Sequence, residues 1–178
     1  MSSVASLDAG AALYSVIQQT KVTQIITQMQ EYAKGIEQYM LDNGQDISAV
    51  AENVNIVNLV ENKDSVKGWN GPYIDAVKSA SDFQLDGIPV GSNKWLYVKQ
   101  AKASVAWDSP GAAHACDGSN DCYIWIETNC YSESIAKALD LQIDGVAGAT
   151  ANKLRYKSCS ADPSTYRVFY QTVRTIKQ

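Results

Sequence analysis

The stretch "QMQEYAKGIEQYMLDNGQDI", residues 28 to 47, predicts the end of a helix. In this stretch and just upstream of it, apolar side chains recur at three- and four-residue steps, as on one face of an α-helix. They are Val22, Ile25, Ile26, Met29, Tyr32, Ala33, Ile36, Tyr39 and Met40. Gly44 suits a left-handed cap after the last turn. We therefore expect a long amphipathic helix from about Ala11 to Leu41, with the stripe from Val22 to Met40 buried against its own domain.

The predicted helix spans about 45 Å, which is longer than a small domain needs. Its first half, "ALYSVIQQTKVTQ" (residues 12–24), has only a weak apolar pattern. We expect this half either to project from the domain or to continue a longer element. Residues 1–10 lack the basic start and apolar stretch of an export signal, and we interpret them as an artificial leader.

The segment "DISAVAENVNIVNLVENKDSV" (residues 46–66) follows the helix. Asp46 or Ser48 could cap a short helix that ends near Val60. In that helix Val50, Val54 and Val57 would share one side, and Leu59 would lie on the far side. The β-branched content leaves a strand open as the alternative.

The segment "GWNGPYI" (residues 68–74) cannot be the interior of a helix. As a ligand site it offers few polar groups and no titratable cluster, so we predict a stiff corner. Gly68 and Gly71 tolerate the positive φ that such a corner can require, Pro72 would fix the exit of the chain, and Trp69 and Tyr73 would pack beneath the turn.

The second half of the chain predicts strands with one inserted helix. Turns are expected at Asp86-Gly87 and at residues 91–93, and strands at residues 122–128, 152–159 and 165–174. A helix is expected from Ser132 to Asp144, with Ile135, Leu139 and Ile143 directed inward. A long helix followed by an antiparallel sheet predicts an α+β fold in a single domain, residues 11–178.

The four cysteines are Cys116, Cys122, Cys130 and Cys159. They lack the close pairs of a zinc site, and His114 is the only histidine. Two disulfides are therefore expected. Among the three possible connectivities we predict local pairing, Cys116 with Cys122 and Cys130 with Cys159. Such bridges imply an oxidising compartment.

The sequence contains no catalytic motif. It has no nucleophile elbow, P-loop, dinucleotide fingerprint or zinc-protease motif. A lone loop histidine does not make a triad, so we expect no enzyme. The formal net charge of −4 argues against attraction of the whole molecule to nucleic acid.

Two acidic fragments resemble calcium ligands. "DGSND" places Asp117, Ser119 and Asp121 as in an EF-hand loop, but the loop lacks the required glycine and glutamate, which predicts a plain polar loop. Asp140 and Asp144 lie one helical turn apart before Gly145. They are the candidate calcium ligands, with a helix-capping role as the preferred alternative, and no other cofactor is expected.

The C-terminal segment is locally basic. Its candidate binding residues for an anionic partner are Lys153, Arg155, Lys157, Arg167 and Arg174. Tyr156, Tyr166, Phe169 and Tyr170 lie among them and could stack on single-stranded DNA. Solvated strand faces with core aromatics are the preferred interpretation.

Residues 28–47 resemble the point at which the long N-terminal helix enters the globular head in type IV pilins and type II secretion pseudopilins. "GWNGPYI" looks like the Trp/Gly–Pro–Tyr corner of those heads. "KALDLQIDGVAGATANKLRYKSC" (residues 137–159) is similar to a stretch of minor pilins, with Asp140, Asp144 and Gly145 in place. Cys130 and Cys159 would then bound the disulfide region near the C-terminus. The family's glycine-terminated leader and about 20 following apolar residues are absent from this chain.

The resemblance implies a pilin-like head in a minor or major subunit of a type IV pilus-like filament, or fimbrium, at the bacterial surface. Its partners would be other pilin subunits and the inner-membrane assembly machinery, with DNA or a host surface as further candidates. The native form would be anchored in the inner membrane before it enters an extracellular filament or the periplasm, whereas this truncated chain would not contact the membrane.

Two alternatives remain open. One is a pseudopilin that serves protein transport, although the Cys130–Cys159 region favours a pilus subunit. The other is a free-standing secreted module for cell adhesion or DNA uptake.

Overall fold

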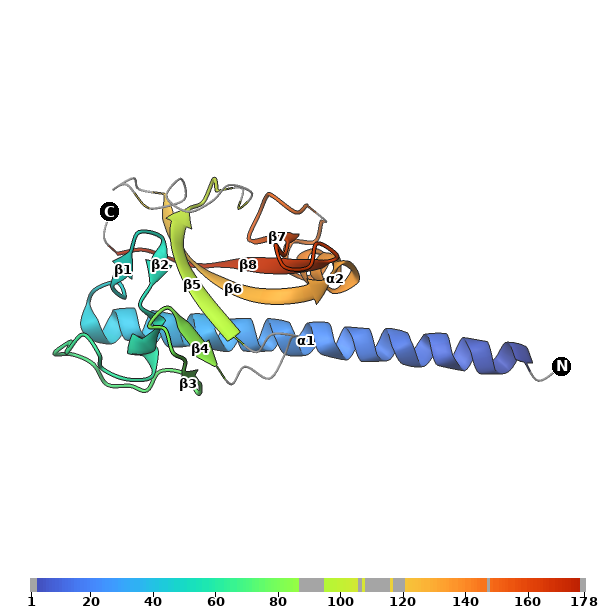
Figure 1. Ribbon diagram of the computed structural model, residues 1–178, viewed down its shortest axis with the longest axis horizontal. Coiled ribbons are helices and arrows are strands. Elements are labelled where there is room, and N and C mark those ends of the chain that lie inside the picture. Colours follow the sequence, from blue (N-terminus) through green and yellow to red (C-terminus); the bar gives the residue numbers. More distant parts are fainter. Residues whose placement is uncertain are drawn as a thin grey trace.

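The computed structural model describes residues 3–86, 95–105, 107, 116, 121–146 and 148–176. Its first element is helix α1 (Ser3–Asn43), which has 41 residues and is therefore roughly 60 Å long. Figure 1 shows that the C-terminal half of α1 runs along the sheet, whereas the N-terminal half extends beyond it. The predicted helix is confirmed, and it begins earlier than about Ala11. Gly44 follows it with φ +61°, as expected of the cap.

The other elements form an antiparallel sheet with a second helix at one end. The path of paired strands is β1-β2-β5-β6-β8-β7, and β3 and β4 join it through β5. The strands are β1 (Ala49–Val50), β2 (Asn53–Val54), β3 (Val77–Lys78), β4 (Gln84–Asp86), β5 (Trp95–Lys102), β6 (Cys122–Ser132), β7 (Leu154–Ser158) and β8 (Thr165–Arg174). Helix α2 (Glu133–Asp144) connects β6 to β7, and η1 (Ile56–Leu59) is a 3-10 helix. This is the α+β fold that the sequence predicts.

The main core lies between α1 and one face of the sheet. On α1 the buried side chains are Val22, Ile25, Met29, Tyr32, Ile36, Tyr39 and Met40. From the sheet they meet Leu96, Val98, Ile124, Ile126, Leu154 and Val168. Ile135 and Leu139 of α2 close the end of this core, and Ile143 is half-buried. The stripe is therefore buried against its own sheet, as expected.

The helix expected between residues 46 and 60 does not form. The chain makes the short β1–β2 hairpin, which turns at Ala51 with φ +53°, and then enters η1. The Asn58 side chain stabilises this path, because it is fully buried and donates to Asp64 Oδ2 over 2.8 Å. Asn58 Oδ1 in turn accepts from the Asp64 N–H. Leu59, expected on the far side, is buried in the main core.

The two predicted hairpin turns lie largely outside the described residues. Strands β4 and β5 are antiparallel partners, with Asp86 opposite Trp95. Gly87 and residues 91–93 fall in the undescribed segment 87–94 that connects these two strands.

The segment 68–74 makes a compact turn against the end of α1. The Trp69 Nε1–H donates to the Asn58 carbonyl over 2.6 Å, and the Tyr73 ring contacts those of Trp69 and Tyr39 edge-on. Gly71 and Pro72 are joined by a cis peptide bond.

The reason for the two glycines differs from the expectation, because neither Gly68 nor Gly71 takes a positive φ. A Cβ on Gly68 would lie 2.6 Å from the Asp42 carbonyl oxygen, and one on Gly71 would lie 2.6 Å from the Trp69 ring. Glycine is required at these two positions because a side chain would clash with its neighbours, and not because the backbone takes a left-handed conformation.

Gly35 lets the corner approach α1. It is buried in the helix, and a Cβ there would overlap Ile74 Cγ2 and lie 2.7 Å from the Tyr73 carbonyl oxygen. In an exposed helix alanine is more favourable than glycine by about 1 kcal/mol. At this position the missing side chain is what permits the contact between the helix and residues 73–74.

We predict that Gly35→Ala lowers the free energy of unfolding by about 1–3 kcal/mol, despite the better helix propensity, because overpacking forces the corner away from the helix. Urea denaturation followed by circular dichroism measures the change. The matched control is Gly10→Ala in the same helix, where no atom lies within 4 Å of the added Cβ. This control should be neutral or stabilising, and equal effects at both positions would contradict the close approach at Gly35.

Candidate functional site

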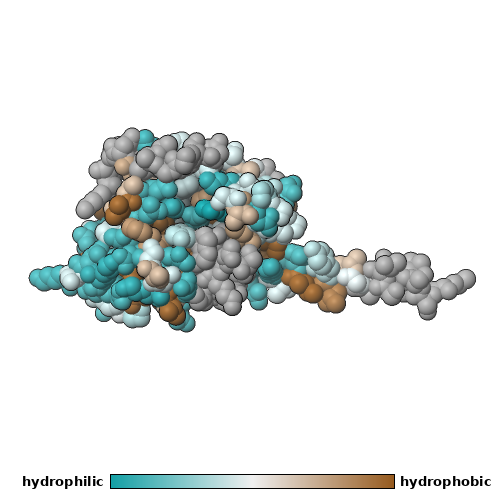
Figure 2. Space-filling view, in the orientation of Figure 1, coloured by the Kyte–Doolittle hydropathy of each residue, from teal (hydrophilic) through white to brown (hydrophobic). Residues whose placement is uncertain are grey.

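The projecting half of α1 carries an apolar surface that no described residue covers. Leu13, Tyr14, Val16 and Ile17 are 56% to 63% exposed. They lie within little more than one helical turn, and residues 9–20 contain no charged side chain. Figure 2 shows this hydrophobic group on the part of the helix that stands clear of the sheet. We call Leu13, Tyr14, Val16 and Ile17 the stalk patch.

The stalk patch is suited to contact with another apolar helix. Each large aliphatic side chain contributes about 1.5–3 kcal/mol when it moves from water into an apolar contact. Spacings of three and four residues place Leu13, Val16 and Ile17 side by side on the helix surface. Among the described residues, no helix is both long and apolar enough to span a membrane.

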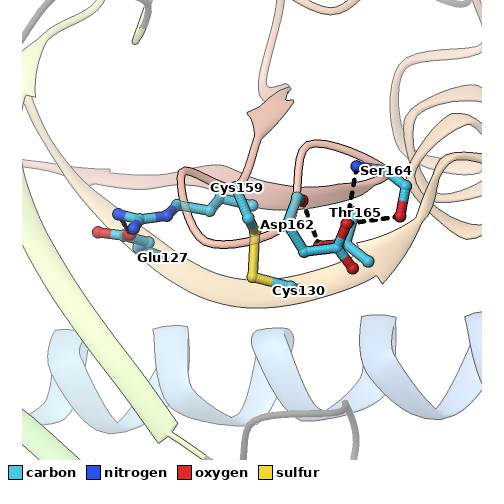
Figure 3. Close-up of a disulfide and its surroundings, with 7 residues drawn as sticks. Glu127, Cys130, Cys159, Asp162, Ser164 and Thr165 are labelled. Atoms are coloured by element: carbon cyan, nitrogen blue, oxygen red, sulfur yellow. Dashed lines mark hydrogen bonds and ion pairs between the residues drawn. A yellow bond between two sulfur atoms is a disulfide. The ribbon is translucent and has the colours of Figure 1, made fainter.

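The two disulfides have the pairing expected from the sequence. Cys116 is linked to Cys122, and Cys130 to Cys159. The second bridge ties the end of β6 to the residue after β7, so it encloses α2 and β7. Figure 3 shows this bridge beside the turn that carries Asp162, Ser164 and Thr165.

Asp140 and Asp144 bind backbone N–H groups of the loop between α2 and β7. Asp140 Oδ2 accepts from Gly148 over 2.5 Å. The two Asp144 oxygens accept from Lys153 and Leu154 over 3.2 and 2.8 Å. Gly145 caps the helix with φ +75°. The geometry fits the capping alternative, in which both carboxylates shape the loop.

Calcium would need further ligands at this site. Within the described part of the chain, no group of three or more His, Cys, Asp or Glu side chains is arranged to hold a metal ion. The other calcium-like fragment cannot be placed, because Asp117 and Ser119 lie outside the described residues, and so does His114.

The five candidate binding residues of the basic segment do not form one surface. Lys157 and Arg167 are directly opposite each other on β7 and β8, whereas Lys153 and Arg174 lie toward the other end of these strands. Arg155 is buried, and its guanidinium donates to the carbonyls of Ala103 and Val105. The expectation that Arg155 is available to a partner is therefore wrong.

The aromatic side chains among these basic residues do not form a stacking platform. Tyr156 is buried in the main core on the helix side of the sheet. Phe169 is buried on the opposite side, stacked on Trp107 at 4.5 Å between ring centroids. Rings that are buried on two faces of a sheet cannot stack on successive bases, so these two residues are core aromatics, as the preferred interpretation has them.

A row of charges crosses the outer face of the sheet, which sequence reasoning missed. Lys99 Nζ lies 3.3 Å from Glu52 Oε1 and 3.8 Å from Glu127 Oε2, and Arg167 Nη1 lies 3.1 Å from Glu127 Oε1. Burial raises the pKa of Glu127, and Lys99 and Arg167 oppose that rise. The alternating pattern of "CYIWIET" could have indicated this row. In a strand it places Glu127 on the face of the sheet opposite to Ile124 and Ile126.

The buried carboxyl of Asp140 makes stability depend on pH. Burial is the main cause that raises the pKa of Asp140, the Gly148 N–H opposes it, and the charge of Asp144 adds to it. A raised pKa in the folded state favours the protonated form. The contribution of Asp140 to stability is therefore complete below the pKa of an unfolded aspartate, about 3.9, and is lost as pH rises through the folded pKa.

We predict that Asp140→Asn becomes more stable relative to the wild type as pH rises from about 4 to 7, by at most about 1.4 kcal/mol per pH unit. Denaturant titrations of both proteins at a series of pH values measure this difference. Asp162→Asn is the matched control: because hydrogen bonds from Ser164 lower the pKa of Asp162, its difference from the wild type should change only below about pH 4, with the opposite sign, and stay constant from about pH 4 to 7. A difference between wild type and Asp140→Asn that does not change with pH would contradict the shift.

No protein-family model, no curated protein and no solved structure matches this chain.

Proposed function

We propose that the chain is a pilin-like head with a helical spine, a structural subunit of a type IV pilus-like filament at the bacterial surface. The stalk patch is the observation that supports this most directly. A helix that exposes four large uncharged apolar side chains beyond its own domain is suited to assembly through helix–helix packing. Assembly and surface interactions, not catalysis, would then be its role.

The order of motifs supports the same proposal. A helix that ends at "DNG", the 68–74 corner and the Asp140–Asp144 loop follow one another as in the family that the sequence resembles. The helix packs on an antiparallel sheet, and the disulfide between Cys130 and Cys159 encloses the C-terminal region. This enclosed region favours a pilus subunit over a secretion pseudopilin.

The remaining parts of the proposal follow from that role. The partners are other subunits of the filament and the inner-membrane machinery that assembles them. The location is an extracellular filament, reached through the periplasm, in which disulfides form and persist.

We predict that the chain self-associates in a concentration-dependent manner and that the double variant Leu13→Glu, Ile17→Glu weakens this association. Two buried carboxylates in an apolar helix contact are costly, so association should weaken by at least about tenfold. Sedimentation velocity measures the change. The double variant Ser15→Glu, Gln19→Glu is the control, because it adds the same charge at the same spacing to exposed positions on the side of α1 opposite Leu13 and Ile17. Equal weakening by both variants would implicate net charge and not the patch.

The filament itself is tested by immunogold electron microscopy of the bacterium that produces the protein. We expect an antibody raised against this chain to label filaments on the cell surface. Label confined to the periplasm would favour the pseudopilin, and label only in the culture medium, without filaments, would contradict a filament subunit.

A further inference from the structure

A small basic cavity lies beside the Cys130–Cys159 disulfide. It has a volume of about 410 Å³ and is lined by Lys157, Ser158, Ser160 and Arg167. The two cations come from neighbouring strands, and the two serines come from the end of β7 and the turn after it. The cavity therefore combines two positive charges with two hydroxyl donors.

The pairing of β7 with β8 places like charges directly opposite each other. Lys157 is the register partner of Arg167, so both side chains emerge on the same outer face. Like charges at directly opposed positions of a sheet destabilise the pair. An anion between these two side chains would turn that repulsion into two attractions.

The row of charges on the outer face contains one more cation than carboxylates, and Lys157 interacts with Glu127 only beyond salt-bridge distance. The row holds two carboxylates, Glu52 and Glu127, against the cations Lys99 and Arg167. Lys157 adds a third cation at the end of the row, and no carboxylate of the described residues lies within salt-bridge distance of it. The Lys157 Nζ lies 5.9 Å from the centroid of the Phe169 ring.

Arg167 also has donors to spare. Its Nη1 binds Glu127, whereas its Nε is buried and has no hydrogen-bond partner among the described residues. The nearby acidic residue does not compensate the cavity: Asp162 binds Ser164, and Figure 3 shows both on the opposite side of the disulfide from Glu127.

We infer that this cavity binds a single oxyanion of the phosphate or sulfate type. A guanidinium fork matches the geometry of such a group, and a lysine ammonium adds a point charge. Two adjacent cations suit a doubly charged oxyanion better than a carboxylate. A nucleic-acid backbone fits less well, because the remaining basic residues do not continue the site: Arg155 is buried, and Lys153 and Arg174 lie toward the other end of the strands. This inference does not depend on filament assembly.

The experiment is a titration of the ¹⁵N-labelled full chain with sodium phosphate, followed by NMR and matched in ionic strength with sodium chloride. We expect saturable shifts of the amides of residues 157–160 and 167. Lys157→Gln should raise the dissociation constant for phosphate by at least about tenfold, which is the loss of affinity expected for one charge-assisted contact. Lys153→Gln, an exposed lysine at the other end of β7, should leave it unchanged.

Further arms identify the source of the oxyanion. Methyl phosphate and sulfate should bind at the same amides, and acetate should bind more weakly. Ser160→Glu, which places a carboxylate in the cavity, should abolish phosphate binding and serves as a second variant. Shifts that rise linearly at all basic residues, or equal losses in the two lysine variants, would overturn the site. An oligonucleotide without terminal phosphate that binds more tightly than phosphate, with a loss in Lys153→Gln, would replace it with a nucleic-acid surface.

Discussion

The apolar stripe of α1 can leave water, within its own domain, only against the face of the sheet that β5, β6, β8 and β7 form. Because side chains alternate across a strand, this one contact decides the facing of every residue in those strands. Ile124 and Ile126 must point to the helix, so Trp125 and Glu127 must point away from it. A shift of one residue in register would exchange these two sets.

The same alternation determines the outer face of the sheet. Every strand side chain that does not point to the helix lies on this face, where the side chains are stabilised in two different ways. Trp125 and Phe169 form a small second core with Trp107, and the Arg155 guanidinium lies 4.7 Å from the centroid of the Trp125 ring. Beside this cluster, Glu127 and its cations form a row that ends in unbalanced positive charge at β7.

The sequence predicted the elements that a strong local pattern specifies, and it failed where distant residues decide. The stripe of α1, α2, β6 and β8 follow from three-residue, four-residue or alternating periodicity, and the disulfides follow from the number and spacing of the cysteines. The prediction for segment 46–60 failed because partners elsewhere in the chain fix its path: Asn53 pairs with Lys99 of β5, and the Val57 N–H donates to the Asp82 carbonyl. Arg155 was wrongly predicted to be exposed. Its partners, the carbonyls of Ala103 and Val105, lie some fifty residues away in the sequence.

The two candidate surfaces also differ in how far the sequence predicts them. The weak pattern of residues 12–24 already suggested a projecting helix, and its exposure to solvent became visible only once the extent of the sheet was known. The like-charged pair of Lys157 and Arg167 depends on the register of β7 against β8, which no local pattern specifies.

The covalent ring closed by Cys130 and Cys159 has a mechanical consequence. The two cysteines are 29 positions apart, and α2 and β7 lie between them. If a force pulled α1 and β8 apart, the residues enclosed by the disulfide could not be extended. The stretched molecule would therefore be shorter by about 100 Å of extended chain. The load would pass directly from β6 through the sulfur atoms to the turn before β8. The extensibility of the molecule is therefore limited by this crosslink and not only by the strength of its packing.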